Sequence, residues 1–282
     1  MCDDAGVTEH PAHFVPTDEG HFLPTRYAQS HWGEDHLNGP AVVGLAAWTL
    51  ERTYGSPEFL PARLTVDLFK AARGVSTATP VRLVRDGRRV RNSECDIVQG
   101  DVTVARATMV QYLTSEAPRG EEWFAATDFT SPTDVDETSS TFISSDGAGW
   151  TSALVDHQNT SRKRTFSRTI DVVEGQPCSP FVRAVMAAEG TSLVTNLGTA
   201  GIGYINGDLT VALARLPHDD WIGVQADSHW AVDGVSVGTA TLFDRAGAFG
   251  SGVVTAVSNS DAQIDFANDP FPERGVGLKD RS

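Results

Sequence analysis

The chain has 282 residues, of which 40% are hydrophobic and 21% charged, a composition typical of a globular protein with one large or two small domains. Its net charge of −15 argues against nucleic acid as the main partner, because phosphate binding needs clustered basic residues. No apolar run is long enough to span a membrane, and three scattered cysteines predict neither a disulfide framework nor a zinc site. With an acidic start where a secretory signal is basic, these features predict a reduced cytoplasmic protein without metal or cofactor.

The first organised stretch is residues 37–113. It opens with a turn and a proline, Asn38-Gly39-Pro40, which is typical of a helix start. The segment that follows, 41–50, reads as a helix that is apolar nearly all round and is therefore predicted to be buried; it contains no acidic residue. Strand-like runs follow at 63–69, 80–85, 90–99 and 102–113. Turns at 86–87 and 100–101 predict that the last three runs form an antiparallel meander.

A second stretch repeats this order. A helix-like segment, 181–196, precedes strand-like runs at 208–215, 221–229, 236–244 and 250–257. The tripeptide Leu-Thr-Val at 64–66 recurs 145 residues later, and the dipeptide Asp-Gly at 86–87 recurs 147 residues later. The shared order of helix and meander indicates an internal duplication.

This organisation predicts an α+β fold in which each antiparallel sheet wraps around a central helix. Two such sheets could pair edge to edge, which would protect an edge that each would otherwise expose. We divide the chain into an N-terminal extension (1–20), a first repeat (21–115), a linker rich in Ser, Thr and Asp (116–160), a second repeat (161–258) and an irregular tail (259–282).

Glu189 is the first candidate for chemistry. In a helix over 181–196, its spacing from Val182, Val185 and Leu193 places it on the apolar face. Burial would raise the pKa of the carboxyl and make it a general base for neutral pH. The alternative is that Gly190 ends the helix and the carboxyl points to solvent.

Asp208 is the second candidate acid. It stands in Asn-Gly-Asp at the start of a predicted strand, close to the proposed site. The alternative is that this word is an ordinary turn. No Gly-x-Ser-x-Gly motif is present, which disfavours a serine hydrolase, and the eight histidines show no metal-binding spacing.

The chain resembles acyl-CoA thioesterases of type II in the thioesterase-like superfamily, which have a double hot-dog fold. The resemblance covers about 20–115 and 178–258 and is carried by 37–40 (LNGP), 64–70 (LTVDLFK), 84–90 (VRDGRRV) and 204–211 (YINGDLTV). It implies two tandem hot-dog repeats, each an antiparallel sheet around a central helix. It also implies hydrolysis of a fatty acyl-CoA thioester by activated water, without a covalent intermediate.

The resemblance assigns three catalytic positions. The acidic position falls on Glu189, where the best-known members have Asp, and two strand positions that are usually Ser or Thr and Gln fall on Asn206 and Thr255. A threonine cannot offer the separate donor and acceptor of a carboxamide. This departure leaves two functions open: a thioesterase, or a non-catalytic acyl-CoA or lipid-binding protein on the same fold.

The resemblance also suggests binding positions. In hot-dog enzymes the start of a central helix commonly stabilises the oxyanion, which makes Asn38 and Gly39 candidates; the alternative is a structural turn and cap. The arginines Arg85, Arg88 and Arg89 could bind the phosphates of coenzyme A, or could form an ordinary solvated hairpin. A homodimer is expected from the resemblance alone.

Overall fold

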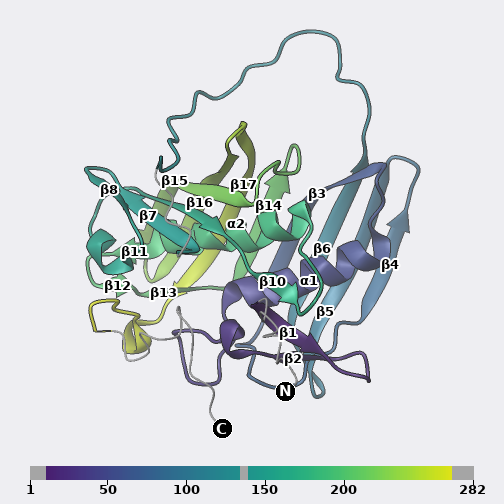
Figure 1. Cartoon of the computed structure of the whole chain (residues 1–282), viewed down its shortest axis with the longest axis horizontal. Helices are drawn as coiled ribbons and strands as arrows, with labels where there is room; N and C mark the ends of the chain where they lie inside the picture. Colours follow the sequence, from purple (N-terminus) through teal and green to yellow (C-terminus); the bar gives the residue numbers. More distant parts are fainter. Residues whose placement is uncertain (1–10, 134–138, 269–282) are drawn as a thin grey trace, which may run out of the picture.

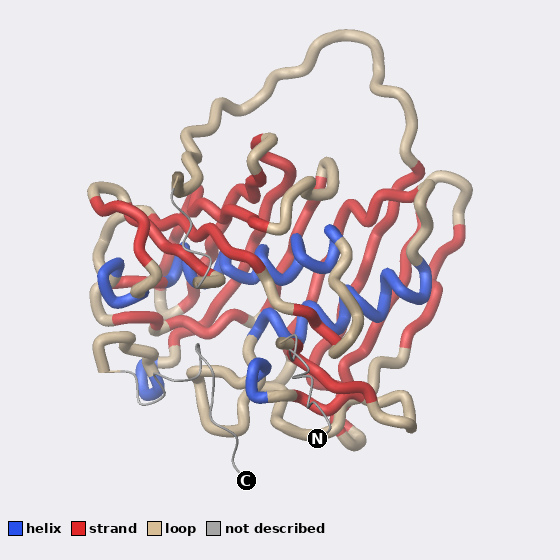
Figure 2. The backbone as a smooth tube through the Cα atoms, viewed as in Figure 1, coloured by secondary structure: helices blue, strands red, loops and turns tan. Residues whose placement is uncertain are grey.

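The computed structural model describes residues 11–133 and 139–268, so the first half of the predicted N-terminal extension and the end of the predicted tail lie outside the described residues. Two long helices lie across one face of a 12-stranded, largely antiparallel sheet (Figures 1 and 2). The α+β prediction is confirmed. No helix within the described ranges is both long and apolar enough to cross a membrane.

Each half contributes one helix and a meander in the predicted order. The first half contains α1 (Gly39–Tyr54), β3 (Phe59–Leu68), β4 (Val81–Asp86), β5 (Val90–Gln99) and β6 (Val102–Leu113). The second half contains α2 (Pro180–Asn196), β14 (Asp208–Leu213), β15 (Trp221–Val232), β16 (Val235–Asp244) and β17 (Gly247–Ser258). The strand orders are β4-β5-β6-β3 and β14-β17-β16-β15, so the two meanders correspond strand by strand.

The halves join through the pairing of β3 with β14. Thr65 pairs with Thr210 in antiparallel register, and their hydroxyl oxygens lie 3.1 Å apart. Because the inner edges pair with each other, neither is left open to another chain. The expected edge-to-edge pairing of the two sheets is present.

Several short strands fall where the sequence predicted none. They are β1 (Ala12–Pro16), β2 (Phe22–Pro24), β7 (Thr141–Ser145), β8 (Ala148–Thr151), β9 (Lys163–Arg168), β10 (Asp171–Val173), β11 (Leu197–Gly198), β12 (Gly201–Ile202) and β13 (Tyr204–Asn206); short 3-10 helices are Arg26–Ala28, Leu154–His157 and Ser260–Ala262. Strands β7 and β8 extend the main sheet beyond β9, although we assigned these residues to a linker. Phe142 and Ile143 are buried there, which gives this Ser- and Thr-rich segment its place in the sheet. Strand β1, in the predicted extension, pairs with β10 of the second half.

Both helices begin as their sequences predict. The Asn38 side chain accepts a hydrogen bond of 2.9 Å from the Ala41 N–H, and the Ser179 hydroxyl accepts one of 3.2 Å from the Val182 N–H. A proline follows each cap in the first turn, where its missing N–H costs nothing. Satisfied helix ends and apolar faces allow both helices to be buried.

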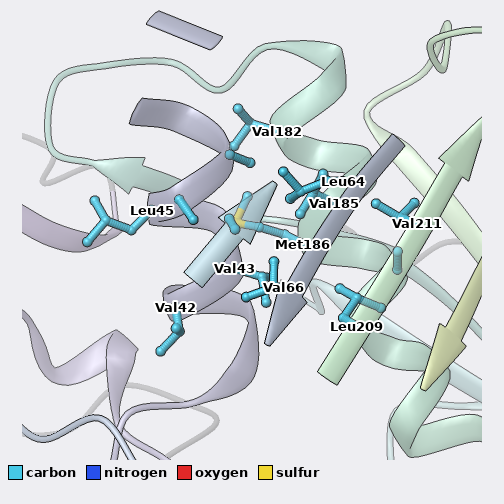
Figure 3. Close-up of a cluster of buried hydrophobic side chains, with 14 of the residues drawn as sticks. Val42, Val43, Leu45, Leu64, Val66, Val182, Val185, Met186, Leu209 and Val211 are labelled. Atoms are coloured by element: carbon cyan, nitrogen blue, oxygen red, sulfur yellow. The ribbon is translucent and has the colours of Figure 1, made fainter. Parts of the chain in front are cut away.

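The two helices pack side by side and antiparallel over the β3–β14 junction. Gly44 of α1 lies against Met186 of α2, while Glu51 near the end of α1 reaches Ser179 at the start of α2. Their apolar side chains meet the inward-facing residues of β3 and β14 in one continuous core (Figure 3). Glycines in the sheet allow α2 to pack closely against the strands. A Cβ at Gly238 or Gly252 would overlap a threonine side chain of α2.

The residues at which the two helices end test two of the sequence predictions. Gly190 does not end α2, which continues to Asn196. The prediction that the first helix carries no acidic residue is wrong, because α1 continues past residue 50 to Tyr54 and includes Glu51.

Candidate active site

Glu189 lies near the middle of α2 and keeps only part of its surface in solvent. Burial raises the pKa of its carboxyl to about 7, against a smaller opposing effect of a hydrogen bond from Asn206. The Asn206 Nδ2 donates this bond to Glu189 Oε1 across 3.4 Å. Strand β13, which the sequence did not predict, therefore presents an amide donor to a carboxyl that titrates near neutral pH.

The Glu189 carboxyl lies against Gly39, the first residue of α1. A Cβ at position 39 would overlap the Glu189 carboxylate, so glycine leaves the carboxylate room to lie against the start of α1. The first N–H groups of a helix have no acceptor within the helix and form its positive end. The structure thus brings together Glu189, Asn206 and the start of α1, three features that the sequence indicated separately.

Asn38 has a structural role at the start of α1. Besides accepting from Ala41 N–H, its side-chain amide donates to the carbonyl oxygens of Tyr27 at 2.9 Å and Gln29 at 3.2 Å. These bonds fix the loop that precedes α1 and cap the helix. They engage both ends of the amide group, so the group that α1 offers to the site is the backbone at Gly39.

The structure does not bring Asp208 and Thr255 to Glu189. The Asp208 carboxylate accepts hydrogen bonds from the N–H and hydroxyl of Thr255. Thr255 is exposed, whereas its neighbours Val254 and Ala256 are buried, so Thr255 faces away from the helices. Asp208 alternates with buried Leu209 in the same way. This pair lies on the outer face of the sheet, and the inward position opposite Asn206 is Ala256.

The arginine hairpin lies between β4 and β5. Arg85, Arg88 and Arg89 are exposed, and the neighbouring Arg91 binds Asp86 with an Nε–Oδ1 distance of 2.8 Å. Strand β4 is the edge of the sheet on the side of α1 (Figure 1). The Arg91 guanidinium lies over the ring of Phe59, which follows the end of α1, so the hairpin adjoins the C-terminal end of α1 and not the Gly39 end, where Glu189 lies.

A cavity of about 660 Å³ opens at the C-terminal end of α2. Its polar lining includes Tyr204, Asn196, Lys163 and His229. Tyr204 and Asn206 are two residues apart on β13 and share a face, about 7 Å apart along the strand. Tyr204 of the cavity wall is therefore a neighbour of Asn206 on β13, although neither Asn206 nor Glu189 is part of the wall.

Sequence reasoning missed two polar residues, half-buried Glu51 and buried Gln111. The absence of Gly or Pro between Glu51 and Gly55 was the available signal that the first helix continues. Gln111 shares the inward face of β6 with the buried residues Ala107 and Met109, so the alternation of the predicted strand could have found it.

The arrangement suits acid–base chemistry on a bound carbonyl compound. Glu189 can take up and release a proton near neutral pH, and the start of α1 can stabilise a developing negative charge. Among residues 11–133 and 139–268, no three His, Cys, Asp or Glu side chains gather in a way that could hold a metal ion.

Two domain families match the sequence. Residues 28–112 match the N-terminal domain of acyl-CoA thioesterases, and residues 111–257 match the C-terminal domain. A comparison with curated protein sequences gave no match.

Solved structures share the fold at low sequence identity. A protein described as thioesterase II from Thermobifida fusca is 14% identical with a TM-score of 0.63, over 87% of this chain and 94% of that one. Acyl-CoA thioesterase II TesB2 from Mycobacterium marinum is 15% identical with a TM-score of 0.58, over 78% and 88%. A hot-dog protein of unknown function from Alicyclobacillus acidocaldarius is 14% identical with a TM-score of 0.63, over 84% and 92%. The predicted hot-dog fold is confirmed.

Proposed function

The chain belongs to the acyl-CoA thioesterase family and is a thioester hydrolase, and from this premise we propose that it hydrolyses fatty acyl-CoA with Glu189 as the general base. The observation that carries the assignment is the position of the Glu189 carboxyl against the first residue of α1. A base and an oxyanion-stabilising helix end then face the same reacting carbonyl.

In this mechanism the Glu189 carboxylate takes a proton from a water molecule while the water oxygen attacks the thioester carbonyl carbon. The carbonyl oxygen becomes negative and is stabilised by the backbone at Gly39 and the positive end of α1. The C–S bond then breaks, and the proton held by Glu189 passes to the departing thiolate. The products are a free carboxylic acid and coenzyme A.

Asn206 is assigned to positioning. Its amide holds Glu189 Oε1 and leaves the second carboxylate oxygen to bind water. A side-chain amide cannot exchange a proton near neutral pH, so Asn206 orients the base without replacing it. The cavity at Tyr204, two residues from Asn206 on the same strand, supports a place for part of the substrate on this side of the pair.

The test is release of free thiol from acyl-CoAs of graded chain length by the wild type and by Glu189→Gln. The substitution keeps the size of the side chain and removes its basicity, and we expect kcat to fall by about 100-fold or more. Asp208→Asn is the matched control, because it makes the same chemical change on the outer face of the sheet. Equal loss in both variants would contradict the assignment of Glu189, and binding of acyl-CoA without turnover in the wild type would support a non-catalytic binding protein.

We further propose that the protein works in the cytoplasm and as a homodimer. The two described cysteines, Cys95 and Cys178, are buried and unpaired, which suits a reducing compartment. Edge strand β4 exposes Leu83 and Val84, which supports pairing with a second copy. Sedimentation equilibrium of the wild type and of Val84→Lys tests the dimer, and an unchanged monomeric mass for both would contradict it.

A further inference from the structure

A second cavity, of about 540 Å³, lies at the opposite end of the helix pair from Gly39. It is bounded by the end of α1, the start of β3 and the end of β6. Its wall includes Glu51, Phe59, Leu60, Gln111, Thr114 and Leu216. A cavity of this size, mainly apolar with a few polar groups, is typical of a site for a small organic ligand.

Gln111 is the polar group that most needs a partner. Its side chain is only 1% exposed, and neither its Nε2 nor its Oε1 has a hydrogen-bond partner within the described part of the chain. An unpaired buried amide is costly, and native proteins rarely keep one without a purpose. Both amide atoms are covered in this structure, so a ligand carbonyl in the cavity would accept from Nε2 once the amide turns toward it, and this bond would remove part of the cost.

Glu51 places a carboxyl in the same wall. Its carboxylate accepts a hydrogen bond from the Ser179 hydroxyl, the cap of α2, and burial raises its pKa. Glu189 meets the first residue of α1, and Glu51 meets the cap of α2. The cavity thus has, in the first half, the pairing of a helix carboxyl with the partner helix's N-terminus that the second half shows at Glu189.

The arginine hairpin borders this cavity. The Leu113 N–H donates to the Arg89 carbonyl at 3.0 Å, one residue before Thr114 in the cavity wall. The guanidinium of Arg91, which pairs in register with Gln111, lies 4.1 Å from the ring centre of Phe59, also in the wall. Arg88 and Arg89, exposed in the turn next to these contacts, therefore stand near the apolar chamber, whereas Arg85 pairs with Asn92 on the outer face of the sheet. Exposed guanidinium groups near a chamber suit phosphate groups.

We propose that this cavity is a second binding site for an acyl thioester carried on a phosphorylated thiol, the class to which acyl-CoA belongs. The acyl chain occupies the apolar wall, Gln111 binds the carbonyl oxygen, and the arginine hairpin binds the phosphates. The site is separate from Glu189, and the inference rests on the proposed function only for the class of ligand.

The experiment counts bound ligands by titration calorimetry. The probe is a decanoyl-CoA analogue in which a methylene group replaces the thioester sulfur, so that it keeps the carbonyl and cannot be hydrolysed. We expect two analogue molecules per chain, and we expect Gln111→Leu to weaken one of the two by about tenfold, as for loss of one buried hydrogen bond. Coenzyme A and decanoate, tested separately, show whether the phosphates or the acyl chain supply the affinity.

Two further variants keep the result interpretable. Arg88→Glu changes only an exposed hairpin residue and is expected to weaken the same site, whereas Arg63→Glu, on the outer face of β3, makes the same charge change and is expected to leave both sites intact. Gln111→Leu replaces an unpaired polar group, so its melting temperature without ligand should not fall; a purely structural role would lower it.

The outcomes separate this inference from the proposed function. One analogue per chain, or two that are both insensitive to Gln111→Leu and Arg88→Glu, would overturn the second site while hydrolysis by the wild type stays intact. A wild type that binds two analogues, one of them sensitive to these variants, but releases no thiol from acyl-CoA would support the second site and contradict the proposed function.

Discussion

The carboxyl of Glu189 is subject to opposing effects. Burial favours its neutral form, while the Asn206 amide and the N-terminus of α1 favour the carboxylate. The balance leaves the pKa at about 7, where both forms are populated at neutral pH. This is the property that a general base with a proton to return requires.

The pH dependence of turnover follows from this value. A general base acts when it is deprotonated, so kcat should rise through about pH 7 and level off above it. The residual activity of Glu189→Gln should lack this step, because the variant has no group that titrates there. Rate profiles from pH 5 to 9 measure both, and a step that survives unchanged in the variant would assign the titration to another group.

Stability should respond in the opposite direction. The folded pKa of Glu189, about 7, lies above its ordinary value of 4.5, so between these values the folded state binds more protons than the unfolded chain. The free energy of unfolding therefore falls as pH rises through this range. Glu189→Gln removes the cost and should be more stable than the wild type at pH 8, by on the order of 3 kcal/mol, but not at pH 4. Thermal unfolding of both proteins at the two pH values checks the difference, which would vanish if the carboxyl were freely solvated.

The sequence could predict the face on which Glu189 lies but not the face of Thr255, for a geometric reason. Three apolar residues at helical spacing determine the face of a helix, so the position of Glu189 could be predicted from them. In a strand the face alternates at every residue, so a shift of one position exchanges the inner for the outer side. The resemblance assigns the strand position to Thr255, whereas the inward residue opposite Asn206 is Ala256. Whether the Gln111 amide has a hydrogen-bond partner depends on residues that are close only in the folded structure, so its lack of one could not be predicted from the sequence.

At the scale of elements, the start of α1 positions the site. Gly39→Ala would place a methyl group where the Glu189 carboxylate lies. The carboxylate is the end of a flexible side chain, so it can move aside, and we expect at least a tenfold loss of kcat with a nearly unchanged melting temperature. Gly149→Ala in β8 is a control at a glycine with open space around it. A large drop in melting temperature for Gly39→Ala would instead indicate that the contact is structural.

The repeat is less regular in its helices than in its strands. The matched strand words are 145 and 147 residues apart, whereas the prolines that begin the helices, Pro40 and Pro180, are 140 apart. The separation of the prolines places the counterpart of Glu189 at Thr49, so Glu51 is not at the equivalent helix position but lies two residues further along α1. The separation changes because the chain between helix and first strand is longer in the second half, where it also forms β11, β12 and β13.

At the scale of the whole molecule, the halves complete each other. Strand β3 pairs with β14, β1 of the N-terminal extension pairs with β10 of the second half, and each helix provides its N-terminus to a carboxyl of the other. The sequence predicted the two repeats and their pairing, since both follow from hydrophobic pattern and from unprotected edges. It did not predict the outer strands β7 and β8, because their segment is rich in Ser and Thr and only two apolar residues anchor β7.

This interdependence predicts the behaviour of a divided chain. A break after Gly120 falls in an exposed loop and leaves Phe129, which stacks on Phe243 at 4.5 Å, with the second half. Residues 1–120 alone would expose the edge of β3 and the inner face of α1, so we expect this fragment to aggregate. Expressed together, the fragments should form a 1:1 complex with thioesterase activity, because Gly39 and Glu189 lie on different fragments. Size-exclusion chromatography and thiol release measure assembly and activity, and activity in residues 121–282 alone would show that α1 contributes nothing to the reaction.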